Sequence, residues 1–286
     1  MKMPEELETI EISHNDSLTV NFLYKSFLGR ILLKFLVKPA VSKFAGFMLD
    51  RSFTRVFIRG FVKRNKINME EYQDIKYKSF NDFFFRKIKN ELRPFPDNEN
   101  DLSSPCDGKL TAYKITADGV FNIKNSIYTI EDLLQDKKLS DEFLEGLCMI
   151  FRLTTDDYHR YAYIDNGQSI YRKKINGVLH TVRPIALNRY KVFIQNAREY
   201  EVMQTDHFGR VIQMEVGALF VGRIKNHEIK QSFKRKEEKG MFEFGGSTVI
   251  MLFKNNTVTL DKTIYENTLN NKETIVKMGQ KIGEKQ

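Results

Sequence analysis

Apolar residues between positions 21 and 65 recur every three or four residues, the spacing of one face of an α-helix. Pro39 and Gly46 interrupt this pattern and predict breaks that divide the segment into two or three helices. Residues 79–89 continue the helical pattern after a serine suited to cap a helix. The pattern ends around residues 93–96, so the first third of the chain is predicted to be helical.

Beyond Pro96 the pattern changes to short alternating stretches that are typical of β-strands. The predicted strands are residues 109–116, 120–124, 148–154, 169–175, 191–195, 200–205, 211–216, 218–224 and 247–253. Loops are predicted at residues 206–209 and at Lys239-Gly240, and one short helix at residues 130–135. The sequence therefore predicts an α+β fold, with a helical N-terminal region followed by a mainly antiparallel β core.

These patterns divide the chain into three parts: a polar segment (1–20), a helical, basic and amphipathic region (21–96), and a β-rich domain (97–286). The first part is acidic and lacks the apolar core of a secretory signal. Charged residues break every apolar run well short of the roughly 20 residues that span a bilayer. Any contact with a membrane is therefore expected to be peripheral.

The net charge of +9 suits an anionic partner, either nucleic acid or an anionic membrane surface. Between Leu18 and Lys66 a single acid, Asp50, stands among phenylalanines, leucines and eleven basic residues: Lys25, Arg30, Lys34, Lys38, Lys43, Arg51, Arg55, Arg59, Lys63, Arg64 and Lys66. Such helices either cover a core or lie in the membrane interface, and both uses can coexist on different faces. No recognition motif accompanies the charge, so no nucleic-acid partner is expected.

Two cysteines, Cys106 and Cys148, are too few and too far apart for a disulfide framework. Neither belongs to a CxxC pair, so no metal site is expected, and a reducing compartment is the default. Cys106 is expected to be inert packing, because nothing near it in the sequence would lower its thiol pKa.

Four short segments carry candidate chemistry: SPCDG at 104–108, DYHRY at 157–161, EVGA at 215–218 and FGGSTVI at 244–250. Alone, each has an ordinary interpretation, such as a turn, a structural histidine or a bend before a strand. In this order and at these distances, they resemble the signature motifs of the phosphatidylserine decarboxylases, pyruvoyl enzymes that make phosphatidylethanolamine. The resemblance runs from Phe22 to Phe253, includes SFNDFFFRKIKNELRPF at 79–95, and is to the short bacterial branch with YHRY, LHTV and GGST.

The resemblance implies a proenzyme that cuts itself between Gly246 and Ser247 into a large chain (1–246) and a small chain (247–286), which stay together as a heterodimer. A serine hydroxyl is a weak nucleophile without a base, and His159 is the expected base. Asp107 matches the family's carboxylate and would orient the imidazole, as in other Asp-His-Ser arrangements. The two glycines before Ser247 permit strained backbone geometry and leave the attacked carbonyl open.

By the same resemblance, Ser247 becomes a covalent pyruvoyl group, which forms a Schiff base with the substrate amine and accepts the electrons left when carbon dioxide departs. The expected reaction converts phosphatidylserine to phosphatidylethanolamine on the cytoplasmic side of the cell membrane, with His159 serving again as general acid. Alternatives are a pyruvoyl decarboxylase of another amino acid and a non-catalytic lipid-binding relative. Association into homo-oligomers stays open.

One position departs from the family pattern. Many members carry a second histidine three residues after the first, where this chain has Ala162. His180, in the segment GVLHTV, is a possible secondary site residue as base or substrate ligand; the alternative is a histidine bonded to a strand end. His14, His207 and His227 carry no motif, and surface or structural roles are expected for them.

Overall fold

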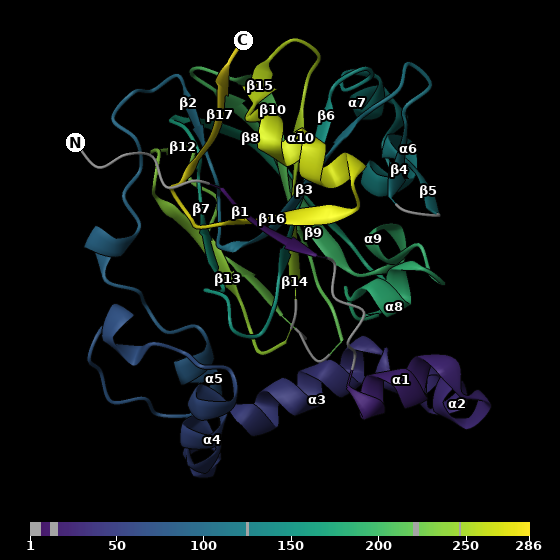
Figure 1. The fold of residues 1–286 in the computed structure, drawn as a ribbon, viewed down its shortest axis with the longest axis vertical. Coiled ribbons are helices and arrows are strands. Elements are labelled where there is room, and N and C mark those ends of the chain that lie inside the picture. Colours follow the sequence, from purple (N-terminus) through teal and green to yellow (C-terminus); the bar gives the residue numbers. More distant parts are fainter. Residues whose placement is uncertain (1–6, 12–16, 124–125, 220–222, 246) are drawn as a thin grey trace.

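The computed structural model describes residues 7–11, 17–123, 126–219, 223–245 and 247–286 (Figure 1). Its N-terminal region is helical, as predicted. The elements are α1 (Leu18–Lys25), α2 (Phe27–Leu36), α3 (Pro39–Leu49), the 3₁₀ turn η1 (Ser52–Arg55) and α4 (Val56–Arg64). In Figure 1 these helices lie along the bottom of the molecule, beside the end of the sheet at which β14 begins.

The helix boundaries follow local chemistry. The side chains of Ser17 and Ser26 cap α1 and α2, and Pro39 occupies the first turn of α3, where its missing N–H costs nothing. The predicted break at Gly46 is wrong, and the region holds four α-helices instead of two or three. Helix α3 continues through Gly46 because Glu243 packs there: a Cβ at this glycine would lie 3.2 Å from the Glu243 Oε2.

The predicted capping serine is confirmed, since the Ser79 hydroxyl accepts a hydrogen bond from the Asp82 N–H at the start of α5 (Phe80–Phe84). The helix is shorter than the helical pattern of residues 79–89 suggested. Beyond it the chain turns extended, and Ile88 forms a bridge with Tyr72. Two 3₁₀ turns flank this bridge, η2 (Met69–Glu71) and η3 (Asn90–Leu92).

A nine-stranded sheet forms the centre of the molecule, and all its pairings are antiparallel. Its strands, in spatial order, are β1 (Glu8–Glu11), β16 (Lys272–Val276), β3 (Gly108–Lys114), β6 (Leu147–Leu153), β14 (Ser247–Phe253), β10 (Gly209–Val216), β9 (Arg198–Thr205), β8 (Gly167–Ile175) and β12 (Ser232–Phe233). The sequence did not predict β1, which lies within the polar first segment. The mainly antiparallel β core is confirmed, and with it the α+β class.

Smaller elements cover this sheet. One three-stranded sheet consists of β11 (Ile224–Asn226), β13 (Glu238–Phe242) and β7 (Arg160–Ala162). A second consists of β15 (Val258–Leu260), β17 (Lys281–Lys285) and β2 (Asp101–Ser103). Strands β4 (Val120–Ile123) and β5 (Ser126–Thr129) form a hairpin. The remaining helices are α6 (Ile130–Leu134), α7 (Lys137–Asp141), α8 (Pro184–Leu187), α9 (Val192–Gln195) and α10 (Lys262–Leu269). Helix α6 confirms the short helix predicted at residues 130–135.

Strand β14 divides two hydrophobic cores. Ile250 and Leu252 point into the core that includes α1, α6 and α9, whereas Val249, Met251 and Phe253 point into the core on the other face. Every residue of β14 is buried, which is why this strand is a continuous apolar run without clear alternation.

Two local predictions are wrong. Residues 191–195 form α9 and not a strand, because Val192 and Phe193 enter the core from one side of a short helical turn. Lys239-Gly240 is not a loop but the middle of β13. Lys239 is fully buried there against Glu215, at 2.7 Å, and a Cβ at Gly240 would meet the Tyr161 hydroxyl at 2.8 Å.

The predicted strand at 218–224 is realised only at its last residue, where β11 begins at Ile224; residues 220–222 lie outside the described part of the chain. The predicted loop at 206–209 is confirmed as the turn between β9 and β10.

Removing the buried Lys239 ammonium should cost about 3–5 kcal/mol of unfolding free energy, because Glu215 and Glu201 would be left as buried carboxylates without it. Urea unfolding of Lys239→Ala in a Ser247→Ala background, which removes the serine of the expected cut, measures this loss. Lys234→Ala, an exposed lysine nearby in sequence, is the control. Equal stability of the two variants would contradict the prediction. The double variant Lys239→Met with Glu215→Gln should recover part of the lost unfolding free energy.

Candidate active site

Ser247 is the first residue of the central strand β14 and is fully buried. Its main chain pairs with Leu153 of β6, and its Oγ has no hydrogen-bond partner among the described residues. Gly245, two residues earlier, has a φ of 130°, which residues with a Cβ rarely adopt. The predicted need for glycine in this turn is met at Gly245; Gly246, the other half of the predicted cut, lies outside the described residues.

His159 lies just before β7 and is fully buried. Its Nδ1 is 2.9 Å from the Asp157 carbonyl, which assigns the proton to Nδ1 and leaves the lone pair on Nε2. Nε2 has no hydrogen-bond partner among the described residues. The ring packs on Phe84 at 4.3 Å between centroids, and the His159 carbonyl accepts a hydrogen bond from the Phe242 N–H. These contacts place the histidine beside the segment that leads into Ser247.

Burial lowers the pKa of His159 to about 4, and the Asp157 charge and the backbone at Asp157 and Gly245 offset part of that effect. The influence of Gly245 shows that its backbone is close to the ring, although it makes no well-formed hydrogen bond with Nε2. At neutral pH the imidazole is therefore uncharged and able to accept a proton.

Asp107 pairs with Arg93 and not with His159. The Arg93 guanidinium donates to both carboxylate oxygens, from Nε at 2.8 Å and from Nη2 at 2.6 Å, and the Met278 N–H donates at 2.8 Å. Both partners of this ion pair are buried. Asp107 nevertheless lies at the same end of the sheet as Ser247, because it directly precedes β3. Within the sheet, Lys109 of β3 pairs with Arg152 of β6, and Arg152 pairs in turn with Thr248 of β14.

A second carboxylate, Asp157, lies near the ring of His159 and raises its pKa. Lys109 Nζ binds this carboxylate at 2.7 Å, and the Thr154 N–H donates to it at 2.6 Å. Sequence reasoning assigned roles to neither Asp157 nor Arg93. Their only signals were their places inside the DYHRY segment and at the Arg-Pro that ends residues 79–95.

Two further positions, Ala162 and His180, concern the question of which histidine can act as acid or base. Ala162 is buried in β7, and its methyl group can do no acid–base chemistry. The His180 ring stacks on Tyr190 at 4.1 Å, and its Nδ1 is 3.3 Å from the Tyr24 hydroxyl. Its main chain is linked to the end of the sheet at which β14 begins, because the Asn196 side-chain amide donates hydrogen bonds to the carbonyls of both His180 and Gly217. Burial lowers the pKa of His180 to about 4.

The other histidines and the cysteines have structural surroundings. His207 binds Asp165 and His227 binds Glu238, as expected for surface or structural roles, and His14 lies outside the described residues. Both cysteines are buried and free. Burial raises the pKa of Cys106 well above its usual value, which agrees with the expected inert role.

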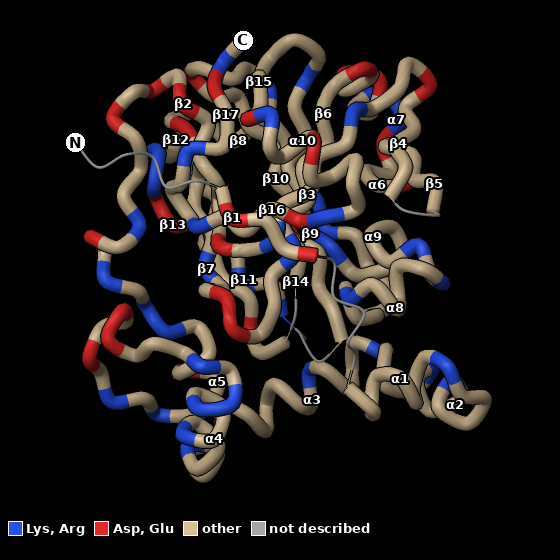
Figure 2. The backbone as a smooth tube through the Cα atoms, viewed as in Figure 1, with Lys and Arg blue, Asp and Glu red and all other residues tan. Residues whose placement is uncertain are grey.

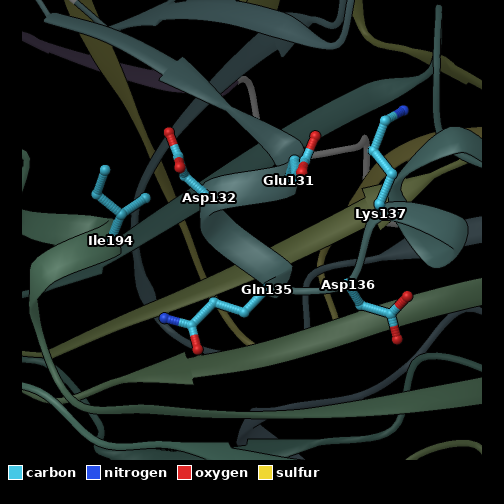
Figure 3. Close-up of a pocket in the computed structure, with 6 residues that line it drawn as sticks. All are labelled: Glu131, Asp132, Gln135, Asp136, Lys137 and Ile194. Carbon is cyan, nitrogen blue, oxygen red and sulfur yellow. The ribbon is translucent and has the colours of Figure 1, made fainter.

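A hollow of about 420 Å³ around α6 and α7 lies outside this group of residues. Figure 3 shows its six lining residues, of which Glu131, Asp132 and Asp136 are acidic and Lys137 is the single cation. Negative charge of this kind repels an anionic ligand, so the hollow does not suit a phospholipid headgroup or any other anion.

Comparison with known proteins identifies relatives along nearly the whole chain. The family model described as phosphatidylserine decarboxylase matches residues 80–284. The chain is 51% identical over 266 residues to phosphatidylserine decarboxylase proenzyme 2 of Clostridium acetobutylicum, covering 93% of this chain and 91% of the relative. It is 39% identical over 272 residues (93% and 92%) to the proenzyme of Clostridium perfringens, and 40% identical over 270 residues (92% and 90%) to that of Ruminiclostridium cellulolyticum.

If His159 is the base for self-cleavage, the rate should stay level from about pH 8 to about pH 5 and fall only as the pH approaches about 4, because only the neutral ring accepts a proton. Chain made by cell-free synthesis and transferred into buffers of different pH allows fragment formation to be timed on gels. A half-maximal rate near pH 6.5, the ordinary histidine pKa, would contradict the assignment.

Circular dichroism at each pH is the control. The unfolded ring takes up a proton near pH 6.5, whereas the folded ring resists it until about pH 4, so stability falls as the pH drops through this range. Only pH values at which the fold persists count toward the rate profile.

Proposed function

Because the chain belongs to the phosphatidylserine decarboxylase family, we propose that it converts phosphatidylserine to phosphatidylethanolamine and carbon dioxide, using a pyruvoyl group made from its own Ser247. One observation carries the assignment of the site: Ser247 Oγ and His159 Nε2 are both buried without a hydrogen-bond partner among the described residues. An unpaired buried polar atom calls for an explanation, and a role in chemistry is one of them. Before the cut, the unpaired Oγ fits a nucleophile and the unpaired Nε2 fits a base. The same surroundings also fit the pyruvoyl group that would be formed from Ser247.

In the proposed maturation, His159 takes the hydroxyl proton of Ser247 at Nε2 while Oγ attacks the carbonyl of Gly246. The neutral ring is oriented by its Nδ1–H bond to the Asp157 carbonyl and by packing on Phe84. Gly245, with a φ of 130°, supplies the backbone geometry that the turn before Ser247 needs.

The C–N bond between Gly246 and Ser247 then breaks, which leaves an ester at Oγ and a free amine at residue 247. Loss of the Cα proton and of the Gly246 carboxylate leaves a dehydroalanine, whose hydrolysis releases ammonia and leaves the keto group. The products are a large chain of residues 1–246 and a small chain of residues 247–286.

Asp107 remains in the proposal as the third member of the group. In the arrangement described, Arg93 holds its carboxylate, and the Asp157 carbonyl performs the orienting role on His159. Asp107 would have to leave Arg93 to bond the imidazole directly. Otherwise it acts by fixing the loop at the start of β3 beside Ser247 through its bond to the Met278 N–H.

The pyruvoyl group supplies a ketone whose conjugated carbonyl accepts the electrons left when carbon dioxide departs. The chain's own residues then exclude water and manage the proton. Ser247, Thr248 and His159 are all buried, so the reacting position is screened from bulk solvent. His159 Nε2 is the group placed to return a proton to the product, and His180, whose ring is engaged by Tyr24 and Tyr190, is the secondary candidate.

The pairing of the strands supports a heterodimer that outlasts the cut. Strand β14 pairs along its whole length with β6 and from Thr248 onward with β10. Strand β16 lies between β1 and β3, and β17 pairs with β2. All of these partners belong to the proposed large chain. Breaking one peptide bond leaves the pairing and the apolar burial of the small chain in place.

We also propose that α1 to α4 dock the enzyme on the cytoplasmic face of the cell membrane. Few of their apolar residues enter the core; the large exposed ones are Leu18, Phe22, Phe27, Leu28, Ile31, Leu32, Phe35, Phe44, Phe47, Met48, Val56 and Phe57. Figure 2 shows Lys and Arg along the same helices. No helix among the described residues is long and apolar enough to cross a bilayer. Apolar insertion combined with cationic contacts is the interfacial mode of binding.

Mass spectrometry of the purified protein tests the proposed maturation. We expect two chains, 1–246 and 247–286, the smaller with a keto group in place of the amine at position 247. Ser247→Ala and His159→Ala should stay at full length, and Asp107→Asn should slow the cut. A full-length wild-type chain would overturn the proposal, and a free serine amine on the small chain would mean cleavage without a cofactor.

A vesicle-binding assay tests the membrane proposal. Phe27→Asp with Phe44→Asp replaces two side chains that are 70% and 66% exposed, and should weaken binding at least about tenfold because two buried rings are lost from the interface. Vesicles of phosphatidylcholine and phosphatidylglycerol separate docking from substrate binding. Ile127→Asp, at a site 57% exposed on β5, is the matched control. Equal binding by both variants would contradict the proposal.

A further inference from the structure

A cavity of about 430 Å³ lies between helix α3 and the end of the central sheet. Gly177, Ala197 and Gly217, small residues at the ends of neighbouring strands, form one wall. Gly217 directly follows Val216, which pairs with Thr248, so Gly217 is level with Ser247 on the adjacent strand. The cavity therefore begins about one strand spacing, roughly 5 Å, from the reacting residue.

Cations line this cavity. Lys43 comes from α3, Lys174 from β8, and Arg223 and Lys225 from the segment that contains β11. Arg198 also lines it, but its guanidinium points elsewhere, donating to the main-chain carbonyls of four residues: Asp132, Leu133, Ile194 and Asn196. The wall therefore presents four positive charges to a ligand.

The acids near the cavity already have partners. Glu199, the one acid that lines it, accepts a hydrogen bond from the Asn226 amide at 2.8 Å and lies 3.7 Å from Arg172. Glu243, buried beneath α3, neutralises part of the charge of Arg223 and Lys225, at 3.4 and 2.7 Å.

Lys43 and Lys174 differ from the other two cations. Both are exposed, and neither ammonium forms an ion pair with a carboxylate in the part of the chain that the structure describes. Glu199, which lies opposite Lys174 across β8 and β9, is the one carboxylate on the wall, and it is engaged by Asn226 and Arg172. Two lysines that face one cavity without ion pairs of their own favour an anion between them.

We propose that this cavity binds the phosphodiester group of the lipid substrate, with Lys43 and Lys174 as its cationic partners. This proposal rests on the proposed function, which places the serine amine of the substrate at residue 247. The phosphorus lies four bonds from that amine, or roughly 5 Å by ordinary bond lengths, which matches the distance from Ser247 to the cavity mouth. Lys43 is also next to the exposed Phe44, so the acyl chains can run from the phosphate toward the membrane-facing surface.

The phosphate suits this cavity better than the substrate carboxylate does. A carboxylate paired with lysines is stabilised in its charged form, which opposes loss of carbon dioxide. A phosphodiester keeps its charge throughout the reaction, so cations that bind it hold substrate and transition state equally. Loss of these cations should therefore raise KM and leave kcat nearly unchanged.

Kinetics of the matured enzyme on short-chain phosphatidylserine dispersed in detergent test the proposal. Lys43→Gln with Lys174→Gln should raise KM about tenfold or more, since two ion pairs with the substrate are lost. Lys262→Gln, an exposed cation of α10 outside both the cavity and the helices proposed to dock on the membrane, should stay within about twofold of wild type. Lys43→Arg with Lys174→Arg keeps both charges and should restore most of the affinity. The extent of self-cleavage reports whether each variant has folded.

Competition distinguishes the source of the phosphate. Soluble glycerophosphoserine should inhibit the wild type and lose that inhibition in the double Gln variant, which supports a headgroup site. Inhibition by inorganic phosphate equal to that by glycerophosphoserine would show a site for any small anion and overturn the assignment to the headgroup. A double Gln variant that behaves like Lys262→Gln overturns the cavity proposal alone, whereas a wild type inactive on phosphatidylserine overturns the proposed function.

Discussion

The hydrogen bonding of β14 on both edges is the constraint on which the rest of the structure depends. This strand pairs with β6 and β10, divides the two cores, and begins at Ser247. A serine at the first position of a central strand cannot move far, so the groups that act on it must be brought to that end of the sheet. The same pairing explains how the chain would keep its fold after the proposed cut before its central strand: the peptide bond adds little once two neighbouring strands and two cores hold the strand.

Burial decides the electrostatics around Ser247. His159 lies in an apolar site against Phe84, and the loss of solvent keeps its ring neutral. The carboxylates are managed differently, since Asp107 is held by Arg93 and Asp157 by Lys109. Asp157 still raises the pKa of His159, but the effect of burial is larger, so the ring stays neutral. The result is an imidazole that is uncharged at neutral pH, as the proposed base requires, while the Ser247 hydroxyl has no competing hydrogen bond among the described residues.

The sequence was sufficient for the helical N-terminal region, most strands, and the placement of Ser247 at the start of a strand, because each depends on local periodicity or turn residues. It failed where tertiary partners override local preference. Lys239-Gly240 has the composition of a turn, yet a buried Glu215 makes the lysine acceptable inside a sheet. The apolar run at residues 191–195 is compatible with either a strand or a helical turn. Packing of the Phe193 ring on Tyr128 favours the helical turn. Arg93 could not be predicted as the partner of Asp107, because nothing in sequence spacing shows which buried cation meets which carboxylate.

The position of Ser247 also explains why the basic helices lie at this end of the sheet. Helix α3 packs at Gly46 on Glu243, two residues before Gly245, so the helix that carries exposed Phe44 is in contact with the strand that leads into the reacting turn. A lipid substrate has to present its headgroup to a buried site while its acyl chains stay in an apolar phase. A site under a helix that docks on the membrane, as we propose for α3, meets both conditions with a short path. The missing side chain at Gly46 lets α3 approach Glu243 closely, so the helix proposed to face the membrane lies against the segment that leads to Ser247.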